Sequence, residues 1–371
     1  MTSNTRVRKM WLWVAWGCLP VTAFAQVAPR ILPVPRAPLE LATGPVLAAN
    51  TQASREAALQ LLARARSSFA LRSARQGYDL KVSFTVDSLG QTNYDGAWQM
   101  EDLFAPGLGH RWTATAASGY TTTSVAAHGE IYQDGTASAV PLRLLEARGV
   151  LFDPIQSPAY ADRGSIRTSS TTFHGESVEC LLMSRSRRGV SPATGRDWEE
   201  TEDCIDPQSG LLQMHSEVPG RYAVYDYSNA PQFGGLTLPR TVTITEAGRI
   251  VSKISVDSLG ALSAPDPGLF VPSDAMKANG PAVAMTSATK VSRFPVQVAA
   301  TSAVTLSPVW VFGMITSTGH LVEAHALQPS DPNSQAAVED AGKIDFSMQT
   351  PAGAPPRQHF VFVIEKFVSP Q

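Results

Sequence analysis

The stretch DLKVSFTV, residues 79–86, decides the fold because apolar and polar side chains alternate along it. Its apolar members are Leu80, Val82, Phe84 and Val86. Successive side chains of an extended strand point to opposite faces, so this alternation predicts a strand with one buried face.

The same pattern continues through most of the chain as far as Leu259. The further runs are 94–100, 112–116, 176–184, 198–205, 211–218, 221–227, 240–245 and 250–259. Turn sequences such as Asp134-Gly135, Pro219-Gly220 and Ala247-Gly248 separate them. Alternating strands with frequent turns are typical of antiparallel sheet.

Helical periodicity is confined to a few segments. Thr51 or Ser54 caps a predicted helix that runs to about Ala74, and its apolar stripe consists of Ala58, Leu61, Leu62, Ala65, Phe69 and Leu71. Arginines 55, 64, 66, 72 and 75 line its other side. They indicate a solvated face, with binding to an anionic lipid surface as the alternative. A short helix is expected at 141–148, among the strands.

Residues 1–25 have the parts of a secretory signal. Arg6, Arg8 and Lys9 precede an uncharged run, and Ala23-Phe24-Ala25 suits a signal peptidase, which predicts a mature chain from Gln26. The alternative is a retained membrane anchor, but the run contains Pro20 and is shorter than the roughly 20 apolar residues that span a bilayer. A periplasmic or secreted protein, with membrane association as an option, is therefore expected.

Cleavage leaves Cys180 and Cys204 as the mature cysteines. An even number in an exported chain indicates a disulfide. Both lie in strand-like runs joined by a loop with Gly189, Pro192 and Gly195, so an antiparallel pair would bring them together. No Cys-x-x-Cys motif is present, and a structural bridge is predicted rather than redox chemistry.

Composition limits the class of partner. Lys and Arg number 30 against 32 Asp and Glu, for a net charge of −2, which gives no broad attraction to nucleic acid. Hydrophobic residues make up 43%, enough for a sizeable core. The length after cleavage suggests two domains.

Three short motifs in the second half of the sheet region resemble the LolA-like lipoprotein-carrier superfamily. They are IDPQSGL at 205–211, FGGLTLP at 233–239 and DPGLF at 266–270. The resemblance implies one helix and a curved antiparallel sheet around an apolar ligand. Phe84, Trp98, Trp112 and Tyr225 would then line a ligand cavity, and the alternative is that they fill a core.

The last eighty or so residues read strand, turn, strand, helix, strand. Residues 309–315 and 321–327 flank the turn at 317–320, Ser330-Asp331-Pro332 opens a helix, and His359 to Val368 form the closing strand. Phe360, Phe362 and Ile364 alternate with other apolar residues, so both faces of this strand should be covered, one by the helix and one by a neighbouring domain or subunit. An exposed edge of such a sheet can accept a partner's strand.

This segment resembles the C-terminal domain of TonB-type energy transducers. The matching pieces are WVFGMI at 310–315, PSDP at 329–332, AAV at 336–338, GAP at 353–355 and the strand from Phe360 to Phe367. The resemblance implies a three-stranded sheet with one helix that binds an envelope protein, with Phe360, Phe362 and Ile364 on the partner-binding strand. The helix end keeps only Phe346 of the family pattern, and the long spacer and firm anchor of a transducer are missing.

No catalytic set is evident. The seven histidines do not cluster, and His320 and His325 should point to opposite faces of a hairpin arm. Motifs for zinc proteases, serine hydrolases and phosphate loops are absent from the sequence. The acidic group at 199, 200, 202 and 203 indicates a solvated face rather than a cation site, and arginines 185, 187 and 188 at a hairpin tip would pair with nearby acids or touch lipid head groups.

The sequence therefore predicts a mainly β protein with an α+β C-terminal domain. The expected parts are a signal at 1–25, a Pro-rich tether at 26–50, a LolA-like domain at 51–260, a linker at 261–295 and a TonB-like domain at 296–371. We expect a non-enzymatic envelope protein, without metal or cofactor, that binds a lipid or a protein partner or forms a homo-oligomer. An energy transducer is the main alternative, and a hydrolase with an unrecognised site is the third.

Overall fold

The computed structural model describes residues 30–31, 45–71, 76–87, 94–127, 129–135, 140–155, 164–184, 195–281, 286–293, 305–316, 318–346 and 359–368. The expected export signal and the arginines at 185, 187 and 188 lie outside these ranges. None of the helices in the described ranges combines the length and apolar composition that crossing a bilayer requires.

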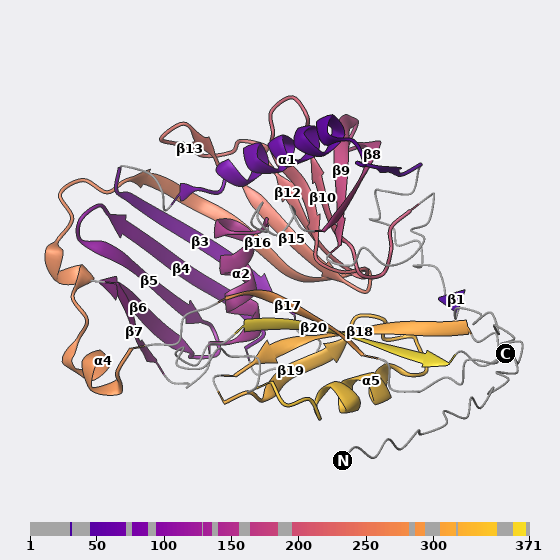
Figure 1. Ribbon diagram of the computed structural model, residues 1–371. Coiled ribbons are helices and arrows are strands. Elements are labelled where there is room, and N and C mark those ends of the chain that lie inside the picture. Colours follow the sequence, from indigo (N-terminus) through magenta and orange to yellow (C-terminus); the bar gives the residue numbers. More distant parts are fainter. Residues whose placement is uncertain are drawn as a thin grey trace, which may run out of the picture.

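A single antiparallel sheet of 13 strands dominates the fold, as the alternating pattern predicted (Figure 1). Its strands, in spatial order, are β2 (Leu47–Ala48), β8 (Ser165–Phe173), β9 (Glu176–Ser184), β10 (Thr201–Ile205), β11 (Leu212–Ser216), β12 (Arg221–Asp226), β15 (Thr241–Glu246), β16 (Arg249–Ala261), β3 (Tyr78–Val86), β4 (Gly96–Ala105), β5 (Gly109–Ala116), β6 (Thr121–Ala127) and β7 (Glu130–Gly135). We call it the large sheet.

Strand β3 shows how the alternation sets the packing. Leu80, Val82 and Phe84 are buried, whereas Lys81 between them is exposed. The register places Phe84 opposite Trp98 of β4, and their rings stack with centroids 5.4 Å apart. A slip of β3 by one residue would turn Phe84 to the other face of the sheet, away from Trp98, so the burial of one face fixes this register.

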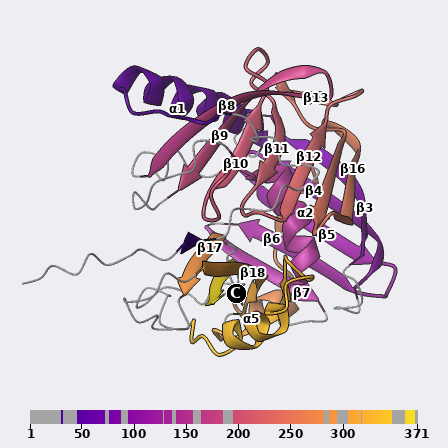
Figure 2. The same cartoon turned by 90° about the vertical axis from the view of Figure 1, so that its right-hand side faces the viewer.

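Two helices lie on the inner face of the large sheet. Helix α1 (Gln52–Ser67) begins at a capping box between Thr51 and Ser54 and buries Ala58, Leu61, Leu62 and Ala65. Helix α2 (Leu142–Phe152) is longer than predicted, and the large sheet curves around it (Figure 2). The remaining small elements are β13 (Gln232–Phe233), β14 (Leu236–Thr237), η2 (Pro267–Phe270) and α4 (Asp274–Asn279).

The C-terminal region forms a second sheet, which differs from the three strands expected. It has five strands in the order β1 (Arg30–Ile31), β18 (Thr305–Ile315), β20 (His359–Val368) and β17 (Thr286–Arg293), with β19 (Leu321–Ala326) also paired to β18. Helix α5 (Ser334–Ala341) covers the side away from the large sheet (Figure 1). Strand β1 comes from the stretch expected to be a tether, and β17 from the stretch expected to be a linker. Each pairs in parallel with a strand that is distant in sequence.

Both faces of β20 are covered within the chain. Val361 and Val363 pack with Ala337 and Ala341 of α5, whereas Phe362 and Ile364 join the core shared with the large sheet. Strands β18 and β17 pair with the two edges of β20. That Phe360, Phe362 and Ile364 belong to a partner-binding strand stays a prediction.

The cysteines form the predicted staple. Cys180 of β9 and Cys204 of β10 are direct cross-strand neighbours and are joined by a disulfide, with a sequence separation of 24 residues. Replacing both by alanine is expected to lower the free energy of unfolding by about 3 kcal/mol, because the unfolded chain loses its closed loop. Urea unfolding with and without dithiothreitol checks this: the reductant should destabilise the wild type and leave the double variant unchanged. Equal sensitivity of the two proteins would contradict the bridge.

Candidate functional site

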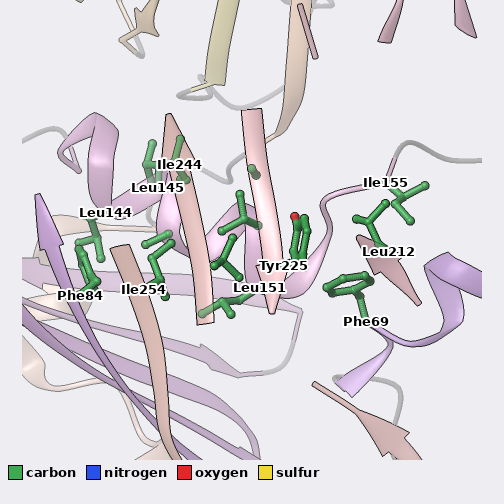
Figure 3. Close-up of a cluster of buried hydrophobic side chains, with 14 of the residues drawn as sticks. Phe69, Phe84, Leu144, Leu145, Leu151, Ile155, Leu212, Tyr225, Ile244 and Ile254 are labelled. Carbon is green, nitrogen blue, oxygen red and sulfur yellow. The ribbon is translucent and has the colours of Figure 1, made fainter. Parts of the chain in front are cut away.

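One apolar cluster fills the space between the large sheet, the two inner helices and the C-terminal sheet, and we call it the inner layer. The four residues predicted to line a ligand cavity, Phe84, Trp98, Trp112 and Tyr225, are all buried members of it. Figure 3 shows part of this layer, with Phe84 beside Leu144 of α2 and Tyr225 beside Phe69. Residues far apart in sequence therefore meet in one continuous apolar region.

The four predicted residues have different neighbours inside the layer. Trp98 stacks on Phe84 and also contacts Tyr94 and Tyr120, with centroids 6.4 and 5.5 Å away. Tyr225 meets Phe69 edge to face at 5.7 Å. The Arg148 guanidinium lies 4.1 Å from the centroid of the Trp112 ring. Such contacts add stabilisation beyond the buried area alone.

Three tyrosine hydroxyls in or beside the layer are buried, those of Tyr120, Tyr225 and Tyr227. The hydroxyls of Tyr225 and Tyr227 have no hydrogen-bond partner among the described residues, whereas that of Tyr120 lies near the Thr122 side chain. Burial raises the pKa of Tyr120 to about 12 and raises the pKa values of Tyr225 and Tyr227 as well. An unpaired buried hydroxyl costs roughly 1–3 kcal/mol, so the Tyr225 and Tyr227 hydroxyls mark positions where a bound molecule or water would gain hydrogen bonds.

The sequence reasoning missed Tyr227 and Tyr120. A signal for Tyr227 was present, because it follows Tyr225 by two positions in an alternating run and should share its face. Tyr120 lies between β5 and β6, outside any run, so alternation gave no indication of its burial.

A buried ion network joins α2 to the sheets. Its members are Asp203, His215, Glu217, Arg221, Glu246, Arg143, Glu146 and His325. Arg143 of α2 makes two hydrogen bonds of 2.8 Å to the Glu246 carboxylate of β15. Burial alone would lower the pKa of Arg143 and raise that of Glu246, but their pairing reverses both shifts. Both groups are therefore charged, although neither is exposed.

Arg221 of β12 is the central cation of the network. It donates to Glu146 of α2, with Nε 3.0 Å from Oε1, and pairs with Glu217. It also lies 3.5 Å from Glu246, and its guanidinium stands 5.0 Å from the Phe312 ring of β18. One side chain thus contacts an inner helix, the large sheet and the C-terminal sheet.

The C-terminal sheet completes the network through β19. His325 Nε2 donates to Glu246 Oε2 at 2.7 Å, because the ionised carboxylate is the acceptor. Two residues earlier, both carboxylate oxygens of Glu323 lie 3.3 Å from the backbone nitrogen of Leu142. A carboxylate at this place satisfies an unpaired N–H and favours the start of α2. The C-terminal sheet therefore helps to hold α2 in the inner layer.

His215 of β11 is a member of the network whose protonation changes with pH in an accessible range. Its Nδ1 lies 2.6 Å from Asp203 Oδ1, and its Nε2 lies 3.3 Å from Glu217 Oε1. Burial alone would lower the pKa of His215, but the Glu217 and Asp203 carboxylates outweigh it and raise the pKa to about 9. The imidazolium is therefore the form present at neutral pH.

Stability should fall in alkali because of this histidine. Its pKa in the folded protein is above the unfolded value, so its contribution is complete below pH 6.5 and is lost as the pH rises through 9. We expect the difference in unfolding free energy between the wild type and His215→Gln to shrink by about 3 kcal/mol over that window. Urea unfolding at intervals from pH 6 to 9.5 measures it, and a difference that does not change with pH would contradict the assignment.

A second buried carboxylate anchors the other half of α2. Asp102 of β4 accepts hydrogen bonds from Tyr78 at 2.8 Å and from Arg148 of α2 at 3.0 Å. His110 Nε2 of β5 lies 2.7 Å from the same carboxylate. Ion pairs thus hold both halves of α2 in place. Each of the three buried charged side chains of this helix has a partner of opposite charge, which offsets the cost of burying it.

The acidic group at 199–203 is not the solvated face that alternation predicted. Glu200, Glu202 and Asp203 are buried, because cations from distant positions reach them. Arg167 Nε lies 2.7 Å from Glu200, Arg196 pairs with Glu202 at 3.5 Å, and Lys366 of β20 lies 2.8 Å from Glu199. Cys180, Cys204 and Glu202 bring three potential metal-binding atoms within 4.8 Å, but the two sulfurs are bonded to each other.

Comparison with known proteins gives similarity in structure only. No protein-family model matches the chain, and no curated protein matches it. A putative outer membrane lipoprotein-sorting protein domain from Vibrio parahaemolyticus is 9% identical, with 56% of this chain and 95% of that chain covered and a TM-score of 0.36.

Two further solved structures are similar over comparable lengths. A LolA superfamily protein from Nitrosomonas europaea is 11% identical, with coverage of 57% and 96% and a TM-score of 0.36. A DUF1329 family protein from Desulfovibrio piger is 9% identical, with coverage of 60% and 98% and a TM-score of 0.37. At these values the likeness assigns neither a ligand nor an activity, and none of the three supports the TonB-type resemblance.

Proposed function

We propose that this chain is a non-enzymatic, exported cell-envelope protein that binds an apolar or lipid ligand in the inner layer. The observation that carries the proposal is the inner layer itself, an apolar region under two helices that contains buried tyrosine hydroxyls without partners among the described residues. Ligand sites are commonly apolar with a few convergent polar groups. The LolA-like resemblance of residues 204–270 implies the same class of ligand.

The disulfide supports the exported compartment. A bridge between Cys180 and Cys204 is stable in an oxidising environment such as the periplasm or the extracellular space, and reduced cytosol disfavours it. A signal at 1–25 that is cleaved before Gln26 belongs to the same proposal. Mass spectrometry of the mature N-terminus tests it, and a retained leader would favour the membrane-anchored alternative.

The C-terminal sheet is proposed to brace the inner layer and to contact an envelope partner through its remaining surface. Bracing is supported by Glu323 at the start of α2 and by His325 on Glu246. The TonB-type alternative, an energy transducer, would need a partner strand to reach β20, whose two edges are paired.

Ligand binding is tested with the apolar dye 1-N-phenylnaphthylamine on the purified full chain. We expect saturable fluorescence enhancement, and Ala223→Leu should weaken binding by about tenfold because the added methyl groups fill the layer beside Tyr225. Val224→Leu, one position along on the other face of β12, is the matched control and should bind as the wild type does. Circular dichroism confirms that both variants fold.

A wild type that gives no saturable signal would contradict the proposal. Turnover of ester, peptide or glycoside substrates by the pure protein would contradict its non-enzymatic part.

A further inference from the structure

Helix α2 begins without a capping side chain of its own. Its N-cap residue is Pro141, which makes no side-chain hydrogen bond, and its first turn contains no acidic residue. The backbone oxygen of Pro141 accepts from the nitrogens of Leu144 and Leu145 at 3.1 Å, and neither bond uses the N–H of Leu142. Leu142 is buried, and an unpaired N–H is costly there, so the start of α2 needs an acceptor from elsewhere.

That acceptor is Glu323, which is 181 residues away in sequence. Both of its carboxylate oxygens lie 3.3 Å from the Leu142 nitrogen. A carboxylate at the first turn also interacts favourably with the helix dipole. Because Glu323 belongs to β19, the C-terminal sheet caps a helix that packs in the inner layer.

A β-bulge in β19 aims Glu323 at α2. The pairing of β18 with β19 shifts in register between Phe312 and Met314, so Glu323 and Ala324 lie opposite Gly313 alone. A Cβ atom at Gly313 would come within 3.1 Å of the Cα atom of Ala324. A larger residue at this glycine would therefore force β19 to shift.

The bulge places two successive side chains of β19 on the same side. Val322 packs with the inner layer and Glu323 meets α2, whereas Leu321 and Ala324 pack with the apolar cluster around α5. Successive side chains of a regular strand alternate between faces, so without the bulge Glu323 would point toward α5.

Glu323 occupies this position at a cost. Its φ is +51°, in the left-handed region that glycine adopts most readily, and burial raises the pKa of its carboxyl above the usual value. The Leu142 N–H and the Arg143 guanidinium act against that rise. A glycine would remove both costs together with the carboxylate, and the contact of the carboxylate with α2 offsets them.

We propose that Glu323 is a conformational strap that couples the docking of the C-terminal sheet to the folding of the first turn of α2. While the sheet is docked, the bulge holds the carboxylate on the Leu142 N–H and the turn is closed. When the sheet moves away, the turn loses its cap, and the change reaches the inner layer that α2 lines. This inference goes beyond the proposed ligand binding, because the strap acts whether or not the inner layer holds a ligand.

Hydrogen exchange of the purified full chain, followed by mass spectrometry on peptides from 140–152, 305–315 and 321–327, tests the strap. Glu323→Gly should speed exchange in the first turn of α2 about five- to tenfold, because the cap is lost. The same substitution should leave exchange in β18 and β19 unchanged or slow it, because the left-handed strain is relieved. Glu323→Gln keeps that strain and removes only the charge, and it should speed exchange at α2 by about two- to fivefold.

Ala264→Gly and Glu339→Gln are the matched controls. Ala264 is exposed and also has a left-handed backbone, with a φ of +49°, but it lies outside the C-terminal sheet. Glu339 is an exposed carboxylate of α5 that accepts a hydrogen bond from Gln335. Neither substitution should change exchange in α2.

Faster exchange at α2 without faster exchange in β18 and β19 would support the strap, because a residue that served only the packing of β19 would loosen both regions. Unchanged exchange at α2 in Glu323→Gly would overturn it, as would an acceleration in β18 and β19 as large as that at α2. A Glu323→Gly variant that circular dichroism shows to be unfolded would also overturn it, because the strap concerns one helical turn and not the whole fold.

Discussion

Replacing Arg221 by methionine is expected to lower the free energy of unfolding by about 3–5 kcal/mol. The guanidinium pairs with Glu146, Glu217 and Glu246, and its removal leaves these carboxylates short of a buried cation. Methionine keeps much of the side-chain volume, so the loss reports charge more than packing. Urea unfolding followed by far-ultraviolet circular dichroism measures it.

Arg249→Met is the matched control for this change. Arg249 lies 3.9 Å from Asp87, and both side chains are more than half exposed. Exposed pairs contribute little, so the variant should remain within about 0.5 kcal/mol of the wild type. Equal effects of the two substitutions would contradict the account of the buried ion network.

Trp310→Ala should destabilise the protein by about 3–5 kcal/mol. Trp310 of β18 belongs to the core shared with the large sheet, and its indole nitrogen donates to the backbone oxygen of Trp198 at 3.0 Å. Its truncation would open a cavity between the two sheets and leave that carbonyl without this donor. Thermal and urea unfolding of the full chain measure the loss, and both sheets should melt in one transition.

Trp310→Phe and Val271→Ala are the two control variants for this prediction. The phenylalanine variant restores part of the buried area and should recover part of the stability. Val271 is 58% exposed, and its truncation should change the stability by less than about 0.5 kcal/mol. If Trp310→Ala were equally mild, the C-terminal sheet would not share a core with the large sheet.

Local pattern predicted most strands of the large sheet, because alternation such as that of residues 79–86 reports directly which side chains are buried. It did not predict β2, β6, β7 or β8. The same reasoning predicted that both faces of the last strand would be covered. The number of strands in the C-terminal sheet was wrong for a physical reason. Strands β17 and β1 pair in parallel with partners distant in sequence, and short stretches give no local signal of such pairing.

Charged residues were the main source of error. The acids at 200, 202 and 203 alternate as a solvated strand would, yet Arg167, Arg196 and His215 bury them. Helix α2 contains Arg143, Glu146 and Arg148, which indicate exposure when read alone, but each has a buried partner on another element. Only the tertiary structure shows that a charge has its counterion.

The candidate site was predicted in part. Aromatic residues at inward positions identified Phe84, Trp98, Trp112 and Tyr225 as members of one buried region. The polar chemistry of that region could not be predicted, because only the tertiary structure shows whether a buried hydroxyl has a hydrogen-bond partner. The spacing of Tyr225 and Tyr227 was the one sequence signal that pointed to it.

Native mass spectrometry of the protein purified from its own envelope tests the central claim most directly. We predict a second mass peak that is heavier by one apolar or lipid molecule, which organic extraction releases and which Ala223→Leu strongly reduces. A single peak at the mass of the mature polypeptide, together with no lipid in the extract and no saturable dye binding, would contradict a ligand-binding role for the inner layer.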